Sequence, residues 1–219
     1  MRSDKKYNRG KKDYQRRPSF RQPRKSFLIV VEGQTEELYL KKFKIDFRSK
    51  LIDIHIVNPG CTDPMNLVNR AMELKKQRER EAKREFVVPY DREDGVWVVY
   101  DLEAPNHIRR TQSPVAKQRA DANNIRIATS DPAFEYWYIL HFEQTTKSFD
   151  DAVKTEEHLI THWPDYRKAT TPPQDIYDKT DDAIKNAQWA RNHLRTSGDD
   201  AKTDVDILVL LLRENSQNH

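Results

Sequence analysis

The most constraining feature of this sequence is a repeated unit in which a short, wholly apolar run ends at an acidic residue. Residues 27–31 read Phe-Leu-Ile-Val-Val and stop at Glu32-Gly33, and residues 96–100 read Val-Trp-Val-Val-Tyr and stop at Asp101. Runs without polar alternation are typical of parallel strands that are buried on both faces. The chain is therefore predicted to be an α/β protein.

Further segments extend this alternation of strands and helices. Additional strands are predicted at residues 52–57 and 125–128. Three helices are predicted from capping residues, and they follow Thr35, Asp63-Pro64 and Ser130-Asp131-Pro132. Two more are predicted over residues 183–194 and 204–212, the first of them from apolar residues at helical spacing. We therefore expect a mostly parallel, Rossmann-like sheet with helices on both faces, formed by residues 26–219.

The charge of the chain is divided unevenly. The formal net charge is +4, but residues 1–25 alone carry eleven Lys or Arg against two Asp, so the remaining residues are net acidic by five charges. Residues 1–25 lack apolar periodicity, so we expect a disordered basic tail. Its cations could hold the phosphates of a nucleic acid through counterion release, or the tail could only confer solubility. The candidate contacts are Arg16, Arg17, Arg21, Arg24 and Lys25.

Acidic side chains lie where the two apolar runs end. Ligands of open α/β sheets bind outside the carboxyl ends of the strands, and Glu32 and Asp101 share that place if their strands are parallel neighbours. In an extended segment, Asp101 and Glu103 would point to the same side. Carboxylates are hard ligands that suit Mg²⁺ or Mn²⁺, and such ions favour phosphoryl transfer. Acids in loops are also common without any such role.

Three segments together resemble the RloB-like protein family. They are Val31-Glu32-Gly33-Gln34-Thr35-Glu36, Val98-Val99-Tyr100-Asp101-Leu102-Glu103 and residues 130–137, Ser-Asp-Pro-Ala-Phe-Glu-Tyr-Trp, followed by His141-Phe142. Their order and spacing also fit, and the likeness covers most of residues 26–212.

The resemblance implies a Toprim-like domain, the metal-dependent α/β fold of topoisomerases, bacterial primases and OLD-type nucleases. It also implies a place in restriction, phage-defence or abortive-infection systems. The Toprim glutamate then falls on Glu32, as general acid or base and metal contact, and the first acid of the Asp-x-Asp pair falls on Asp101. Glu103 replaces the second aspartate, which puts the metal geometry there in question.

The resemblance assigns further site residues. Glu36 matches a second family glutamate and is a candidate metal ligand, although an acid in the first turn of a helix is also favoured by the helix dipole. Glu135, in the Phe-Glu-x-Trp motif, is a candidate catalytic carboxylate with the same alternative. His141 is a secondary candidate that would orient Glu135 or a phosphate, and it could instead be a core histidine.

Other reactive side chains are given structural interpretations. His158 and His162, four residues apart, could share a metal on one helix face, but no glutamate follows His158 as in zinc metalloproteases, so the pair is read as structural. The single cysteine, Cys61, excludes a disulfide framework and a multi-cysteine zinc site, and a reducing cytoplasm is expected.

These features predict a metal-dependent protein, with Mg²⁺ or Mn²⁺, that processes nucleic acid as a nuclease of a bacterial defence system. Two alternatives stay open: a non-catalytic or regulatory subunit that acts with an ATPase encoded nearby, and a nucleotide-binding sensor. The chain contains no Walker-type loop, so ATP hydrolysis would have to come from a partner. The substrate, DNA or RNA, and self-association are left open. No membrane partner is expected, because no apolar run is long enough.

Overall fold

The computed structural model describes residues 25–47, 52–85, 87–194 and 200–217. The tail candidates Arg16, Arg17, Arg21 and Arg24 lie outside the described residues. Lys25, also assigned to the tail by the prediction, is the first residue of a strand, and its Nζ donates a hydrogen bond to Asn215 Oδ1 (2.5 Å).

The described residues form a single five-stranded sheet. The strand order is β2-β1-β3-β4-β5; β1 to β4 are parallel to their neighbours, whereas β5 is antiparallel to β4. The strands are β1 (Lys25–Val31), β2 (Ile52–Val57), β3 (Val96–Asp101), β4 (Arg126–Asp131) and the two-residue β5 (Lys202–Thr203). The mostly parallel sheet is confirmed, and so is the pairing of β1 with β3 that places Glu32 beside Asp101.

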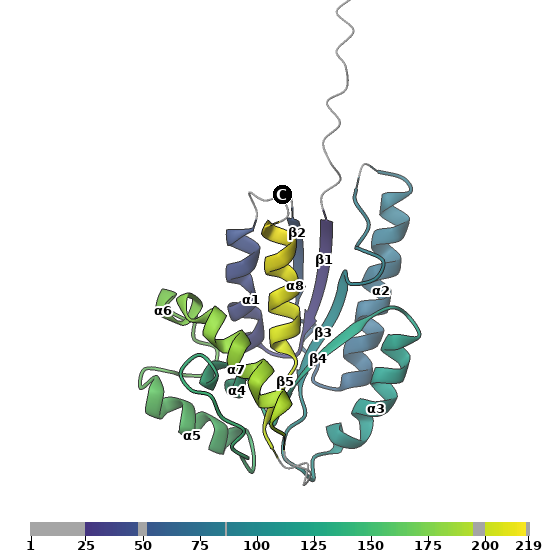
Figure 1. Cartoon of the computed structure of the whole chain (residues 1–219). Coiled ribbons are helices and arrows are strands. Elements are labelled where there is room, and N and C mark those ends of the chain that lie inside the picture. Colours follow the sequence, from purple (N-terminus) through teal and green to yellow (C-terminus); the bar gives the residue numbers. More distant parts are fainter. Residues whose placement is uncertain (1–24, 48–51, 86, 195–199, 218–219) are drawn as a thin grey trace, which may run out of the picture.

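Both faces of the sheet are covered, as the unbroken apolar runs predict (Figure 1). In β1, Leu28 and Val30 face one core, while Phe27, Ile29 and Val31 face the other. The first face packs against α2 (Pro64–Ala82) and α3 (Ile108–Asp121). The second packs against α1 (Gln34–Asp46), α4 (Glu135–Ile139), α5 (Ala152–His162), α6 (Gln174–Asp178), α7 (Thr180–Asn192) and α8 (Val205–Gln217).

The two cores differ in composition. Apart from Tyr100, the core under α2 and α3 contains small and aliphatic side chains, and α3 contributes Ala116 and Ala120 to it. The core on the other face is rich in aromatic rings, with Tyr39 in ring contact with six others. Because its buried side chains are small, α3 lies close to the sheet. It can therefore bring polar side chains such as Arg109 to the carboxyl edge of the sheet.

Helix starts were predicted with mixed success. α2 begins as expected, because the Asp63 side chain accepts the backbone N–H of Asn66 and proline occupies the first helical position. The predicted cap at Thr35 is wrong: α1 starts after Gly33, and Thr35 lies within its first turn. The helix predicted directly after Pro132 starts only at Glu135 and has five residues, all buried.

Three elements were not predicted: α3, α6 and β5. α3 escaped notice because it contains Pro114 and no apolar stripe of large side chains. β5 has only two residues and α6 only five, too few for a periodic pattern. No helix in the described part of the chain is both long and apolar enough to span a bilayer.

Candidate functional site

Glu32 and Asp101 meet at the carboxyl edge of the sheet. The Glu32 N–H donates to the Val99 carbonyl (3.0 Å), so the residue after β1 is tied to β3. In return, the backbone N–H of Asp101 donates to Glu32 Oε2 (3.2 Å). The parallel register of β1 and β3 therefore places these two carboxylates side by side, as the position of acids after parallel strands predicts.

Two glutamates from helices complete a group of four carboxylates, Glu32, Glu36, Asp101 and Glu135, which we call the acid cluster. Glu36 comes from α1 and Glu135 begins α4; their exposed fractions are only 4% and 3%. Burial raises the pKa of Asp101 well above its usual range, and the negative charges of Glu36, Glu135 and Glu32 raise it further. These acids are therefore close enough to repel one another.

Glu36 folds back over the start of its own helix. A Cβ added at Gly33 would lie 2.8 Å from Glu36 Oε2, so any larger residue there would require this carboxylate to shift. Hydrogen bonds from the backbone N–H groups of Gly33 and Glu36 lower the pKa of Glu36, as in the reciprocal half of a capping box. Burial outweighs them and, with the charges of Glu32 and Glu135, raises that pKa to about 7.

Glu135 is held by a segment from a distant part of the chain. The Tyr166 hydroxyl donates to Glu135 Oε1 (2.6 Å), and both side chains are buried. The same segment reaches α1, because the Ala169 N–H donates to Thr35 Oγ1 (3.3 Å). Burial raises the pKa of Glu135, while the hydrogen bond from Tyr166 and the charge of Lys168 lower it. Residues 166–169 thus join two helices that supply acids to the cluster.

Arg109 is the residue of this site that the sequence interpretation missed. Its Nη1 lies 2.6 Å from Glu32 Oε1 and 3.2 Å from Glu103 Oε1, and the arginine is 8% exposed. Burial raises the pKa of Glu32, and the Arg109 charge opposes that rise. The sequence signal was weak, because Arg109 lies in the unpredicted α3. Arg109 therefore neutralises part of the negative charge at the acid cluster.

Glu103 does not stand beside Asp101 as expected. The expectation assumed an extended segment, but β3 ends at Asp101 and Glu103 has a left-handed φ of 63°. This turn directs the Glu103 carboxylate to Arg109, while the charges that act on Asp101 come from Glu36, Glu135 and Glu32. The same-side premise is wrong for this pair, although Glu103 still adds negative charge near Glu32.

Arg110 locks the turn that contains Glu103. Its guanidinium binds both carboxylate oxygens of Asp131 at the end of β4, and it donates to the carbonyls of Glu103 (2.8 Å) and Ala104 (3.1 Å). The Glu103 N–H also donates to the Pro132 carbonyl (2.8 Å). The loops after β3 and β4 are therefore bound together, and neither Arg110 nor Asp131 was identified from the sequence.

His141 lies in the aromatic core, with both ring nitrogens engaged. Its Nδ1 is 2.9 Å from the Trp137 carbonyl and its Nε2 is 3.3 Å from the Tyr39 hydroxyl. The carbonyl can only accept, so Nδ1 carries the hydrogen and Nε2 accepts from Tyr39. Burial lowers the pKa of His141 to about 4, so the ring is neutral. This arrangement favours the core alternative over an orienting role.

The donor set of the acid cluster suits a hard cation. Oxygen ligands alone are the preference of Mg²⁺ and Mn²⁺, and Mg²⁺ is usually held by one or two carboxylates with waters and substrate phosphates. No three of these carboxylates bring ligand atoms within 4.8 Å of one another. An ion here would therefore be held by two carboxylates and several waters, rather than by protein ligands alone. A cation would relieve the mutual repulsion that raises the pKa of Asp101.

Comparison with known proteins identifies a family. The sequence model of the family described as RloB-like protein matches residues 27–212, which covers β1 to α8 and the whole acid cluster. No curated protein and no solved structure matches the chain significantly. Because the match spans most of the sequence, the chain belongs to the RloB-like protein family.

Proposed function

We propose that this chain is a metal-dependent phosphodiester hydrolase that acts on nucleic acid, with Mg²⁺ or Mn²⁺ at the acid cluster. One observation carries the proposal: four carboxylates from β1, β3, α1 and α4 converge at the carboxyl edge of a parallel sheet and repel one another. Among the described residues Arg109 pairs with only one of the four acids, Glu32, and burying the other carboxylates without a cation is costly, so a stability role does not account for the cluster. Ligand binding at this edge does.

The side chains divide into three roles in this proposal. Asp101 and Glu36 would hold the ion, which when bound would polarise a phosphate oxygen. Glu32, partly exposed and hydrogen-bonded to the Asp101 N–H, would move the proton of the attacking water. Arg109, which contacts Glu32, would stabilise negative charge on the phosphate. Glu135, held by the hydrogen bond from Tyr166, would lie behind the carboxylates that hold the ion and keep them in position.

The proposal includes the finer assignments that the family resemblance implies, a Toprim-like domain and a role in phage defence or abortive infection. The order of the acids supports the first, since Glu32 follows β1 and Asp101 ends β3. Glu103 is the departure from that pattern, and its pairing with Arg109 assigns it to charge balance rather than to the ion.

A second candidate function is a regulatory subunit or nucleotide sensor without catalysis. The ion pairs of Arg109 with Glu32 and Glu103 favour it, because a fixed guanidinium can neutralise carboxylates in place of a metal. The two functions differ in what Arg109 does: in the hydrolase it acts on the substrate, and in the subunit it substitutes for the ion.

The deciding experiment incubates the purified full-length chain with labelled single-stranded DNA, duplex DNA and RNA under Mg²⁺, Mn²⁺ or EDTA. The hydrolase predicts cleavage that needs the metal and is lost in Glu32→Gln. The matched control is Asp182→Asn, which removes an exposed carboxylate on α7. Absence of cleavage on every substrate, or equal cleavage in EDTA, would contradict the proposal.

Arg109→Gln separates the two candidates. If Arg109 acts on the phosphate, this variant binds Mg²⁺ at least as well as the wild type and loses turnover. If Arg109 substitutes for a metal in a regulatory subunit, neither protein turns over substrate, and only the variant shows Mg²⁺ binding by calorimetry. Metal-dependent cleavage by the wild type that is unchanged in the variant would contradict both roles of the arginine.

A further inference from the structure

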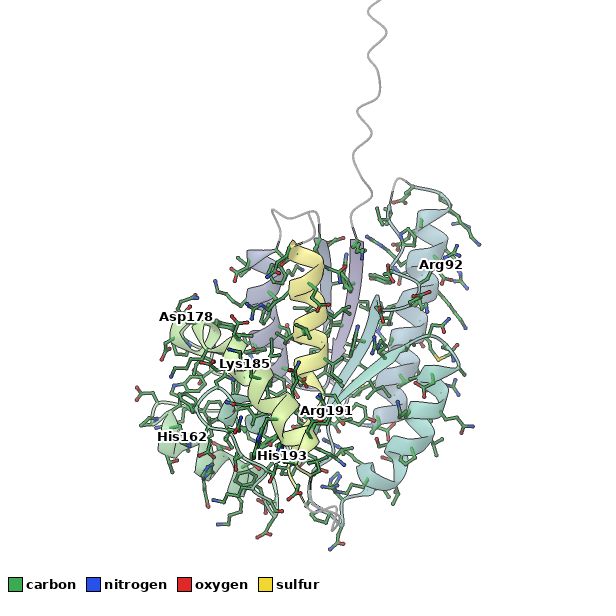
Figure 2. The ribbon with its side chains drawn as sticks, in the orientation of Figure 1. Arg92, His162, Asp178, Lys185, Arg191 and His193 are labelled. Carbon is green, nitrogen blue, oxygen red and sulfur yellow. The ribbon has the colours of Figure 1, made fainter. Side chains whose placement is uncertain are left out.

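A second cluster of metal-ligating side chains lies away from the acid cluster, on α5. His158 and His162 are one helical turn apart on the same face of that helix, and Figure 2 shows His162 on it. The fold adds Glu143, from the segment that follows α4. Its Oε1 lies 2.8 Å from His158 Nε2, and its Oε2 lies 3.4 Å from His162 Nε2.

These three side chains are compact enough to share one ion. One ligand atom from each lies within 4.8 Å of the others, a condition that no other set of three such side chains meets in the described part of the chain. Zinc bonds of about 2.0–2.1 Å at tetrahedral angles place neighbouring ligand atoms about 3.3 Å apart. The two contacts use different oxygens of Glu143: Oε2 already lies 3.4 Å from His162, and the 2.8 Å contact of Oε1 to His158 would open by about half an ångström.

The His162 ring has a nitrogen that the protein leaves unused. Its Nε2 is buried and has no hydrogen-bond partner among the described residues, since 3.4 Å to Glu143 exceeds a normal hydrogen bond. Such a group is costly unless something satisfies it. The ring is also held in place, because it stacks on Phe142 with centroids 5.5 Å apart. An ion at the position facing Glu143 would use this nitrogen.

The His158 ring is placed in the same way but has a competitor. Phe149 packs against it, with centroids 5.4 Å apart, and Lys147 Nζ lies 3.3 Å from its Nδ1. An ammonium only donates, so this contact needs Nδ1 without hydrogen, whereas a metal on Nε2 needs the hydrogen on Nδ1. Lys147 is exposed and free to move into solvent. A surface cavity of about 390 Å³ is lined by Lys147 and by His158, the one of the three ligands that borders it.

We propose that Glu143, His158 and His162 form a Zn²⁺ site that ties α5 to the segment after α4. Two imidazoles and one carboxylate are a zinc donor set that leaves the fourth position to water. The interpretation of the histidine pair as purely structural missed this because Glu143 precedes His158 by fifteen residues and only the fold brings it near. The site shares no ligand with the acid cluster, so it does not depend on the proposed hydrolase.

The test is calorimetric titration of the tag-free, full-length protein with ZnCl₂, together with the visible spectrum of the Co²⁺ form. The site predicts one equivalent of Zn²⁺ and the absorption of tetrahedral Co²⁺. Loss of a residue that only supports a metal ligand costs up to about a hundredfold in affinity. His162→Gln removes a ligand itself, so it should weaken Zn²⁺ binding by at least that factor. Lys147→Met should bind several-fold more tightly, because it removes the competing ammonium.

Two controls keep the outcome interpretable. His193→Gln changes an exposed histidine directly after α7, whose ring stacks on Trp189, and this variant should bind Zn²⁺ as the wild type does. Glu32→Gln should also bind normally, which separates this site from the acid cluster. If His162→Gln fails to fold, Glu143→Gln replaces it. Less than one equivalent bound by the wild type, or equal affinity in the ligand variants, would overturn the site and leave only a hydrogen-bonded clamp.

Discussion

Two buried polar regions flank α4, and they differ in whether their polar groups are satisfied by neighbouring residues. At the start of the helix, Glu135 belongs to an acid cluster in which burial raises the pKa of both Asp101 and Glu135, and repulsion from the other acids raises that of Asp101 further. Just after its end, His141 has one partner for each ring nitrogen and is neutral. Burial is therefore common to both regions. What distinguishes the candidate site is negative charge that the described residues compensate only in part, since Arg109 pairs with Glu32 but not with Glu36, Asp101 or Glu135.

The largest expected effect is on catalysis and touches only the acid cluster. Asp101→Asn keeps the shape of the side chain but removes the charge that would hold the ion. We expect turnover to fall at least a thousandfold, about 4 kcal/mol in the barrier. Rates measured with Mg²⁺ on the cleaved substrate, against Asp182→Asn, check this. Activity within tenfold of the wild type would remove Asp101 from the site.

The next effect is on stability and depends on pH. The pKa of Glu36 rises from 4.5 to about 7 on folding, so the folded chain holds this proton more tightly than the unfolded chain. That stabilisation is complete below pH 4.5 and is lost as the pH rises through 7, a difference of about 3 kcal/mol. Glu36→Gln should remove this slope in metal-free buffer, as urea unfolding at several pH values would show.

His141 should give the opposite slope in an overlapping pH range. Its pKa falls from 6.5 to about 4 on folding, so the unfolded chain takes up the proton first. This contribution is present above pH 6.5 and is lost as the pH falls through 4, again by up to about 3 kcal/mol. His141→Asn, which keeps a donor for the Trp137 carbonyl, should flatten the acid limb. An unchanged acid limb would show that the pKa of His141 is the same in the folded and the unfolded chain.

The smallest effect concerns the link between residues 166–169 and the acid cluster. Tyr166→Phe removes the hydroxyl that donates to Glu135, and it should lower the free energy of unfolding by about 2 kcal/mol because a buried acceptor loses its partner. Tyr177→Phe is the matched control, since its hydroxyl makes only long contacts of 3.3 and 3.5 Å. Equal losses in both variants would mean that the contact to Glu135 has no special weight.

The parts of the fold that could be predicted from the sequence are those that produce a pattern of residue types over a few neighbouring positions. The apolar run of β1 and the Asp63-Pro64 start of α2 each carry a physical signal within a few residues. The acids after β1 and β3 followed from strand order alone. α4 was placed but misjudged, because aromatic residues at helical spacing indicated a long helix where the chain makes five buried residues.

The rest of the site depends on contacts between distant segments. Arg109 reaches Glu32 from a helix that has no apolar stripe, and Tyr166 reaches Glu135 across 31 positions of sequence. Glu103 shows the limit of local geometry, because one left-handed residue was enough to turn its carboxylate away from Asp101. Nothing in the composition of these segments indicates such encounters, and only the folded chain reveals them.

The contacts of Arg110 connect two loops that adjoin the acid cluster. By holding Asp131 and the carbonyls of Glu103 and Ala104 at once, it makes the loops after β3 and β4 a single mechanical unit. Asp101 begins one loop and Glu135 follows the other. If the acid cluster binds an ion and a phosphate as proposed, this clamp would couple the loops that adjoin Asp101 and Glu135, so that binding of one ligand would change the affinity for the other.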